Sequence, residues 1–518
     1  MLGSEKVKQR SRTENSIINS TMSIITQVLT VILNFAVKTV FIKMLNDEYL
    51  GVNGLFTNII TMLSLADLGI GIAIPYSLYK PLAEKDEQKI NILMNFYKKI
   101  YNIIGMVVLL IGLSLTPFLG LIIKDIPDNV PNLSLIYMLF VIHSASSYFF
   151  VYKKFLIDSD QKGYITSRII FAFSTILSII QIILLVITKN YILFLLASII
   201  MVILQNIYIS YKANKMYPFI KNKTNDKLSK DDVKDIKKNV SSLFIYKVGT
   251  VIMNGTDNII ISKFIGLIIV GFYSNYVLII NSVTNVLNQI FNAITSSIGN
   301  LVVTTNKKRS KEIYDNLNFA NFWLYSLFGI CLMVLINPFI DIWIGKKYVM
   351  SFSIVFLLVL NFYILGMQSV TNSFRNAYGL FWKAKYRPII MVIINIVVSV
   401  ILVQFIKIEG VLVGTLISRL VTTAWLDPYI VHKYGFKISS KKYYIDYVKY
   451  LSTFIIVALL VNYLISFVAI TNIIVLILMA ILVVIVINII FILLFFKTSE
   501  FNYFFDKIKN LFLKKVRH

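Results

Sequence analysis

Apolar runs of membrane-spanning length recur along almost the whole chain. Hydrophobic residues make up 57% of its 518 residues and charged residues only 15%. Because the hydrocarbon core offers the backbone no hydrogen-bond partner, and about 20 residues of helix cross it, such runs fold as transmembrane helices. We predict an all-α polytopic membrane protein with about 14 spans. Their approximate limits are 17–42, 51–79, 95–123, 133–152, 164–188, 191–211, 241–262, 268–301, 316–343, 352–376, 388–406, 410–430, 446–468 and 472–496.

Positive charge is concentrated in alternate loops. Of the 51 lysines and arginines, 41 lie in one alternating set of loops and tails and only seven in the other set. The positive-inside rule therefore places both termini and the loop 212–240 in the cytoplasm. We expect a multi-pass protein of the bacterial cytoplasmic (inner) membrane. The net charge of +26 does not require a nucleic-acid partner, because membrane topology accounts for where the basic residues lie.

A stripe of polar side chains follows one helical face of the first span and recurs 220 residues later. Three- and four-residue steps keep such side chains on one face of a helix. Polar groups at membrane depth persist where they face a bundle interior or a wet cavity, so we expect both stripes to line a transport pathway. The first stripe contains Gln27, Thr30, Asn34 and Lys38, and the second contains Lys247, Thr250, Asn254 and Asn258, with Asp257 beside it.

The internal repeat continues beyond the stripes. At the same offset Gly51 aligns with Gly271, and farther on Pro117 aligns with Pro338. Spans seven to twelve then repeat spans one to six, as parallel repeats about an axis along the membrane normal. We expect two six-helix lobes related by pseudo-twofold symmetry, followed by two further helices. The expected divisions are 1–211 for the N-lobe, 212–240 for a cytoplasmic connector, 241–430 for the C-lobe, 431–496 for helices 13 and 14, and 497–518 for a basic amphipathic tail.

Amide side chains gather on two further predicted spans. Amides suit sugar hydroxyls because they both donate and accept hydrogen bonds. Such residues also serve simply to bond one membrane helix to another, and that interpretation stays open for each of them. The candidates are Asn281, Asn285, Asn288 and Asn292 in the eighth span, and Gln368 and Asn372 in the tenth.

Charged residues within the predicted spans favour an anionic substrate. A low-dielectric wall strengthens the field of an uncancelled charge, so an excess of cations should attract phosphate groups. An alternative role for Lys38 is to extend its side chain to the membrane–water interface. The two arginines lie near the cytoplasmic boundary of the membrane. The two aspartates pair with cations or bind a coupling ion. The cations are Lys38, Lys247, Arg375 and Arg419, and the carboxylates are Asp67 and Asp257.

Motifs for enzymatic chemistry are missing from the sequence. It contains no GxxxxGK[ST] phosphate-binding loop and no Cys/His/carboxylate set with metal-ligand spacing. The predicted outer loops are too short for a catalytic domain. We therefore expect neither an enzyme nor a bound cofactor or metal.

Residues 46–90, NDEYLGVNGLFTNIITMLSLADLGIGIAIPYSLYKPLAEKDEQKI, resemble the second-span region of bacterial polysaccharide-biosynthesis flippases of the Wzx type. These belong to the multidrug/oligosaccharidyl-lipid/polysaccharide exporter (MOP) superfamily, whose repeated six-helix lobes agree with the duplication. The resemblance implies a flippase that moves undecaprenyl-pyrophosphate-linked oligosaccharide repeat units across the membrane by alternating access, for surface polysaccharide such as capsule or O-antigen. Cations would hold the pyrophosphate and amides the sugars.

The resemblance also implies partners and leaves alternatives. Expected partners are the lipid-linked oligosaccharide, membrane lipids, polysaccharide polymerase machinery and a coupling ion, H⁺ or Na⁺. A lipid II flippase of the same superfamily relies on several arginines in its early helices, whereas the first two spans here offer only Lys38 and Asp67. A multidrug/cation antiporter would need uncompensated carboxylates, and the intramembrane carboxylates are outnumbered by cations.

We predict that Lys247→Ala impairs transport more than Lys38→Ala, because the Lys247 cation lies deeper in its span and interfacial water replaces it less readily. Export of the lipid-linked glycan by cells carrying each variant measures the difference. Wild-type export by both variants would refute the assignment of these cations to the pathway.

Overall fold

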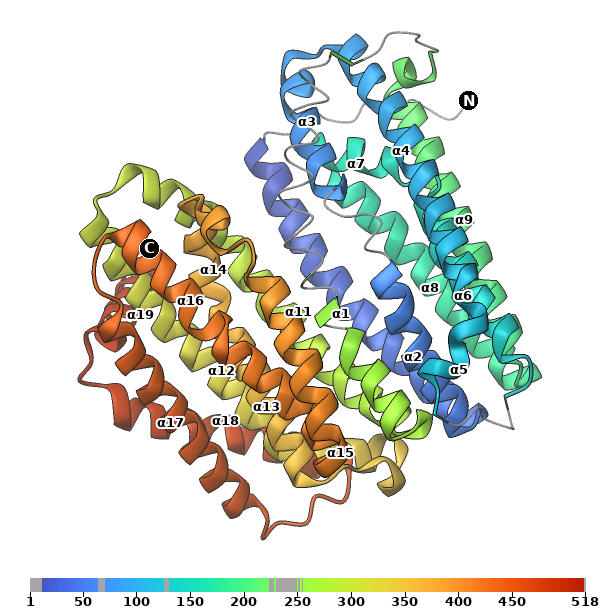
Figure 1. The fold of residues 1–518 in the computed structure, drawn as a ribbon. Helices are drawn as coiled ribbons and strands as arrows, with labels where there is room; N and C mark the ends of the chain where they lie inside the picture. The colour runs from blue at the N-terminus through green and yellow to red at the C-terminus, as the bar shows by residue number, and fades with distance from the viewer. Residues whose placement is uncertain are drawn as a thin grey trace. The chain divides into compact units, whose positions relative to one another are not determined.

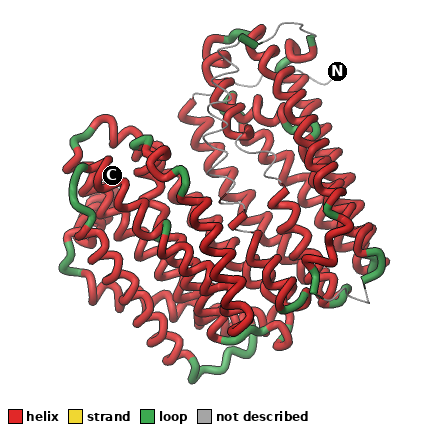
Figure 2. The backbone as a smooth tube through the Cα atoms, in the orientation of Figure 1, coloured by secondary structure: helices red, strands yellow, loops and turns green. Residues whose placement is uncertain are grey.

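The computed structural model describes residues 12–63, 70–124, 130–222, 228–229, 249, 252–253 and 255–516. Helices account for all the regular secondary structure of these residues, which include no strand (Figures 1 and 2). Contacts between residues divide the chain into two compact units, Met1–Gly271 and Phe272–His518. The predicted all-α class is therefore confirmed.

The first unit is a bundle of long helices with short segments at their ends. In it α1 packs against α8, while α6 packs against both α4 and α9. Its elements are α1 (Arg12–Met44), α2 (Asp47–Leu63), α3 (Ile70–Glu84), α4 (Glu87–Ser114), η2 (Thr116–Phe118), α5 (Leu119–Ile122), α6 (Leu133–Tyr148), α7 (Tyr152–Ser159), α8 (Gly163–Thr188), α9 (Tyr191–Met216), η3 (Pro218–Lys221), the helical residues 255–264 and the start of α11 (Leu267–Thr304).

A tight hairpin joins the predicted spans 164–188 and 191–211. Helix α8 ends at Thr188, and Lys189 turns the chain with a left-handed φ of 49°. The Asn190 side chain then caps α9, accepting hydrogen bonds from the backbone N–H groups of Ile192 (2.9 Å) and Leu193 (3.2 Å). Such a cap satisfies two of the amides that a helix start leaves without an intrahelical partner.

Glycines hold residues 255–271 against α2. A Cβ on Gly51 would overlap the backbone of Leu267, and one on Gly271 would come within 2.9 Å of the Gly51 nitrogen. Small residues let membrane helices approach this closely. Gly51 and Gly271 are also the two glycines that the internal repeat aligns. Because of this packing the first compact unit extends to Gly271, beyond the predicted connector at 212–240.

A polar contact joins the residue between α9 and η3 to the loop after α7. Tyr217 donates a hydrogen bond from its hydroxyl to Asp160 Oδ2 (2.6 Å), and Lys162 Nζ lies 2.6 Å from the same oxygen. Burial, together with this hydrogen bond, raises the pKa of Tyr217 above its usual value. The phenol therefore stays protonated and donates to Asp160 throughout the physiological pH range.

The second unit contains the rest of α11 and the helices that follow it. Helix α12 is central, since it packs against α13, α17 and α18. The elements are α12 (Lys307–Ile344), η4 (Lys346–Tyr348), α13 (Phe352–Gly366), α14 (Gln368–Ala377), η5 (Leu380–Ala384), α15 (Arg387–Val421), α16 (Thr423–Ile430), η6 (Val431–Phe436), α17 (Lys441–Ile465), α18 (Ile473–Phe495) and α19 (Ser499–Val516).

The chain folds back on itself inside α15, where the sequence predicts a boundary between two spans. Ile406 and Lys407 leave the helical conformation, and Lys407 has a φ of 50°. The two halves then pack closely: Asn395 Nδ2 donates to Thr415 Oγ1 (2.9 Å), and Ser399 Oγ donates to the Val411 carbonyl (3.2 Å). The predicted spans 388–406 and 410–430 therefore form a hairpin.

The predicted spans that fall within the described residues coincide with helices. Among the described residues, ten helices, or eleven if the bent pair α6–α7 is one span, are long and apolar enough to cross a membrane. One of them, Trp382–Phe436, includes the Lys407 turn. Half of the predicted span 241–262 lies outside the described residues, as do residues 64–69 within the predicted span 51–79. The number and composition of these helices indicate a multi-pass membrane protein.

The predicted amphipathic tail is helical in α19. Its residue Phe501 stacks on Trp323 of α12 with ring centroids 6.0 Å apart. The first turn of this helix therefore packs against its own unit.

We predict that Gly414→Val destabilises the α15 hairpin, because a Cβ at this position already meets the Ser399 backbone nitrogen at 2.7 Å. Overpacking of this kind costs on the order of 1–3 kcal/mol. Thermal unfolding of the purified protein should show a lower midpoint for this variant than for Gly120→Val, a control position with no atom within 4 Å of the added Cβ. Equal midpoints for the two variants would contradict the tight hairpin.

Candidate functional site

The polar stripe of α1 remains partly accessible. Gln27 and Thr30 are half-buried and Asn34 is exposed. Lys38, one turn farther along, is half-buried, with its Nζ 5.9 Å from the centre of the Phe41 ring. Exposed amides at membrane depth are costly against lipid, so a face of this kind favours contact with water or a polar substrate.

The second stripe is described only at its end. Lys247, Thr250 and Asn254 lie outside the described residues, and so does Asp67. Asp257 and Asn258 are buried, with exposed fractions of 9% and 4%. The Asn258 Oδ1 has no hydrogen-bond partner among the described residues, so it can accept a hydrogen bond from a donor group.

The amide face of α11 is the most accessible of the predicted sites. Asn281, Asn285 and Asn288 are all exposed and follow each other at helical spacing, whereas the side chain of Asn292 lies outside the described residues. The hydroxyl of Thr284 on the same helix donates to the Ile280 carbonyl (2.8 Å) and is occupied. The asparagines therefore supply the polar surface here.

The amides of α14 are more enclosed. Gln368, the first residue of α14, is only 2% exposed, and neither atom of its amide has a hydrogen-bond partner among the described residues. Asn372, one turn later, is half-buried. Helix α13 ends just before, where Asn321 Nδ2 donates to the Gly366 carbonyl (3.1 Å). A buried amide without partners is expensive, so Gln368 is suited to a bound polar group or water.

Arg375 belongs to a buried charge cluster. Its NH1 lies 2.9 Å from Asp427 Oδ1 in α16, and Arg387 at the start of α15 pairs with Asp427 Oδ2. The three side chains are at most 5% exposed. Two guanidinium groups share one carboxylate, so the cluster joins three elements and carries one net positive charge.

Aromatic side chains pack beside this cluster. Tyr314 is fully buried, its hydroxyl lies 2.9 Å from Thr371 Oγ1, and its ring centroid lies 5.3 Å from that of His432. His432 is itself tied to the Pro428 carbonyl at 2.8 Å through Nδ1. The charged side chains of the cluster are themselves at most 5% exposed, and an interior of low dielectric constant strengthens the attraction between them.

Arg419 connects the α15 hairpin to α13. Its NH1 donates to the backbone carbonyl of Asn361 (2.9 Å) and to the Asn361 Oδ1 (3.1 Å). The Asn361 amide in turn donates to the Leu412 carbonyl (3.0 Å). The structure thus brings Arg375 and Arg419 into the second unit, each already bonded to protein acceptors.

Asp427 and Arg387 were missed by the sequence analysis. Asp427 lies within the predicted span 410–430 and was the signal to notice, because a lone carboxylate in an apolar run requires a cationic partner. Arg387 lies between the predicted spans 352–376 and 388–406, just outside the predicted membrane segments. The structure shows that Arg375 has a specific carboxylate neighbour, Asp427, which it shares with Arg387.

No candidate metal site is found among the described residues. They contain no group of three or more His, Cys, Asp or Glu side chains that could hold a metal ion.

Comparison with known proteins shows the fold. No family model matches the sequence, and no curated protein matches it. A structure of the lipid II flippase MurJ in an inward closed conformation matches 92% of this chain and 99% of its own, with a TM-score of 0.62 and 14% identity. An inward-facing multidrug resistance MATE family transporter of the MOP superfamily matches 77% of this chain and 95% of its own, with a TM-score of 0.59 and 14% identity.

A third match is a MOP superfamily transporter from Pyrococcus furiosus, with a TM-score of 0.56 and 14% identity over 83% of this chain and 98% of its own. At these identities the likeness concerns the fold. The chain therefore has the fold of MOP superfamily transporters.

We predict that Asp427→Asn destabilises the protein by about 3–5 kcal/mol, because it leaves two buried guanidinium groups without their carboxylate. Thermal unfolding measures the loss, and Asp506→Asn, at an exposed position of α19, is the control. Adding Arg375→Gln to Asp427→Asn should restore part of the stability by removing one of the stranded charges. A double variant less stable than Asp427→Asn alone would argue against charge pairing as the cause.

Proposed function

We propose that this protein translocates polyprenyl-pyrophosphate-linked oligosaccharide repeat units across the cytoplasmic membrane by alternating access, as a step in surface polysaccharide synthesis. The extent of the likeness to the lipid II flippase is the observation that carries this proposal. The match to the lipid II flippase covers 92% of the chain, whereas the 440 residues before α17 make up only 85% of its 518 residues. The match must therefore include part of α17–α19. The match to the MATE transporter covers only 77% of the chain.

The polar faces support a sugar-bearing substrate. Asn34 on α1 and Asn281, Asn285 and Asn288 on α11 keep exposed side chains on helices of membrane-spanning length. Such groups would be costly against lipid tails, and amides recognise hydroxyl groups through both donor and acceptor atoms. An oligosaccharide offers many hydroxyl groups along its length, so a row of amides suits it better than a compact hydrophobic cation.

In this proposal Lys38 and Lys247 bind the pyrophosphate. Arg375 and Arg419 are bonded to Asp427 and Asn361 and are more suited to holding the helices in place. The lysine ammonium shifts its position readily because it stands at the end of a flexible four-carbon stem, which suits an anion that enters and leaves. Asp67 and Asp257 remain proposed sites for charge pairing or for a coupling ion, H⁺ or Na⁺.

The same proposal includes fourteen membrane crossings, made up of two six-span lobes and two further helices. The Lys407 turn supports it, because it converts one long apolar segment into two crossings. We also propose that both termini are cytoplasmic and that polysaccharide polymerase machinery receives the product.

Lipid II flipping is the second candidate, favoured by the likeness to MurJ. Its substrate is also attached to a polyprenyl pyrophosphate, so the two candidates differ in the sugar and peptide head group. A multidrug or cation antiporter is the third, favoured by the MATE likeness and by the buried Asp257.

We predict that mass spectrometry of lipids extracted with the gently purified protein will find a polyprenyl-pyrophosphate oligosaccharide. Replacing Asn285 and Asn288 together by leucine should reduce its amount several-fold, because two exposed amides on one face are lost. Gln404→Leu is the matched control, since Gln404 is an exposed amide on another helix.

The mass of the head group decides between the candidates. A peptide-bearing disaccharide identifies lipid II. If no lipid-linked glycan is found and hydrophobic cations raise the unfolding temperature, the flippase proposal fails in favour of the antiporter.

A further inference from the structure

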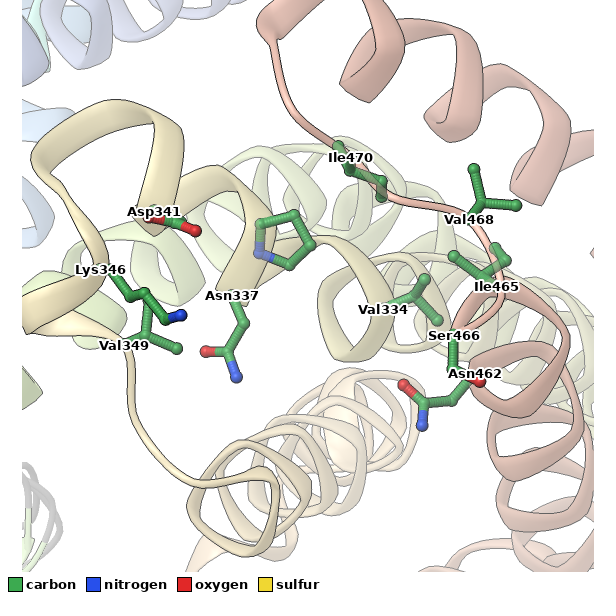
Figure 3. A pocket seen from close by; sticks show the side chains of 11 residues that line it. Val334, Asn337, Asp341, Lys346, Val349, Asn462, Ile465, Ser466, Val468 and Ile470 are labelled. Carbon is green, nitrogen blue, oxygen red and sulfur yellow. The ribbon is translucent and has the colours of Figure 1, made fainter.

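A pocket of about 310 Å³ lies in the second unit at the ends of three membrane-spanning helices (Figure 3). Its lining residues come from the last turns of α12, the segment around η4, the end of α17 and the linker before α18. Asp341 and Lys346 stand on one side, and Asn462 and Ser466 of α17 stand on the other (Figure 3). None of the predicted substrate residues lines it.

The end of α12 is shaped by a proline and by a hydrogen-bonded network. Pro338 lacks the N–H that would bond the Val334 carbonyl in a regular helix, and both residues line the pocket. Tyr276 donates from its hydroxyl to Asn337 Oδ1 (2.6 Å), and Asn337 Nδ2 donates to the Met350 carbonyl (3.0 Å). The backbone N–H of Met350 completes the ring by donating to the Tyr276 oxygen (2.7 Å). One wall of the pocket is therefore fixed.

Two opposite charges occur on this wall. Helix α12 ends at Ile344, and Gly345, with a φ of 108°, turns the chain so that Lys346 follows Asp341 into the lining. Both side chains are exposed, and among the described residues neither takes part in an ion pair within 4.0 Å. The wall thus offers one carboxylate and one ammonium to a ligand. A zwitterion has the complementary charges, whereas an anion would be repelled by Asp341.

The other side of the pocket is apolar and continuous with surface suited to lipid. Ile465 and Val468 contribute to the lining. Leu464, Phe467 and Ile474 nearby are 52%, 72% and 67% exposed. Because α17 ends and α18 begins here, the pocket lies at the depth where the hydrocarbon core meets the head groups.

The size agrees with a head group. Ligand pockets typically have volumes of about 300–1,000 Å³, so 310 Å³ is at the small end. It is sufficient for a charged head group and leaves long chains outside, on the apolar surface.

We propose that this pocket binds the head group of a zwitterionic aminophospholipid. The ammonium of the lipid lies at Asp341 and its phosphate at Lys346, while its acyl chains follow the exposed apolar side chains of α17 and α18. The bound lipid connects α12 to the last two spans. This site is independent of the transported substrate, so its failure and that of the proposed transport function are separate results.

The test is a titration of full-length, delipidated protein in detergent, followed by native mass spectrometry. The probes are phosphatidylethanolamine and phosphatidylglycerol. Wild type should bind phosphatidylethanolamine on the order of tenfold more tightly. Lys346→Gln should weaken that binding by a similar factor, whereas Lys347→Gln, a neighbour outside the lining, should not. Asp341→Asn should abolish the preference for phosphatidylethanolamine. The mutated side chains are exposed, so unchanged unfolding temperatures are expected for all three variants.

Two results would overturn the proposal. One is equal or tighter binding of phosphatidylglycerol by the wild type. The other is an equal effect of Lys346→Gln and Lys347→Gln. Glycerophosphoethanolamine, the head group without chains, tests the apolar part: it should displace the lipid only at concentrations far above that of the lipid itself, and displacement at equal concentration would exclude a role for the acyl chains.

Discussion

A charge inside a membrane protein needs a partner that lipid cannot supply, and the second unit depends on this constraint at Asp427. The carboxylate is fully buried and meets Arg375 from α14 and Arg387 from α15. Removing the carboxylate would leave two guanidinium groups uncompensated in a low-dielectric interior, so Asp427 is the member of the cluster whose loss should cost most.

At other places in the structure, close packing at small residues holds helices together. Gly51 and Gly271 allow the start of α11 to lie against α2, and Gly414 allows the two halves of α15 to pack after the Lys407 turn. In lipid, helices gain little from hydrophobic burial against each other, so contact at glycine and interhelical hydrogen bonds decide which helices pair. Asn395, Ser399 and Thr415 supply such bonds within the hairpin.

Polar residues in the spans therefore have two different roles. Arg419, Asn361 and Arg375 bond to protein groups and stabilise the fold. Asn34, Asn281, Asn285 and Asn288 remain exposed, and Gln368 is buried with an amide that has no partner among the described residues. In the proposed function the second set contacts the substrate. The sequence pattern alone does not separate it from the first set, because both sets share helical spacing within apolar runs.

The sequence by itself determined the all-helical class and most helix positions, including the α8–α9 hairpin and the boundary near Lys407. It could do so because membrane thickness sets the length of an apolar run and the backbone must satisfy its own hydrogen bonds in lipid. Only the tertiary structure decided which polar side chains are occupied. Arg375 and Asp427 are 52 residues apart and meet only when α14 and α16 pack together. The pocket beside Asp341 likewise exists only because α12 and α17 end together, which no local pattern encodes.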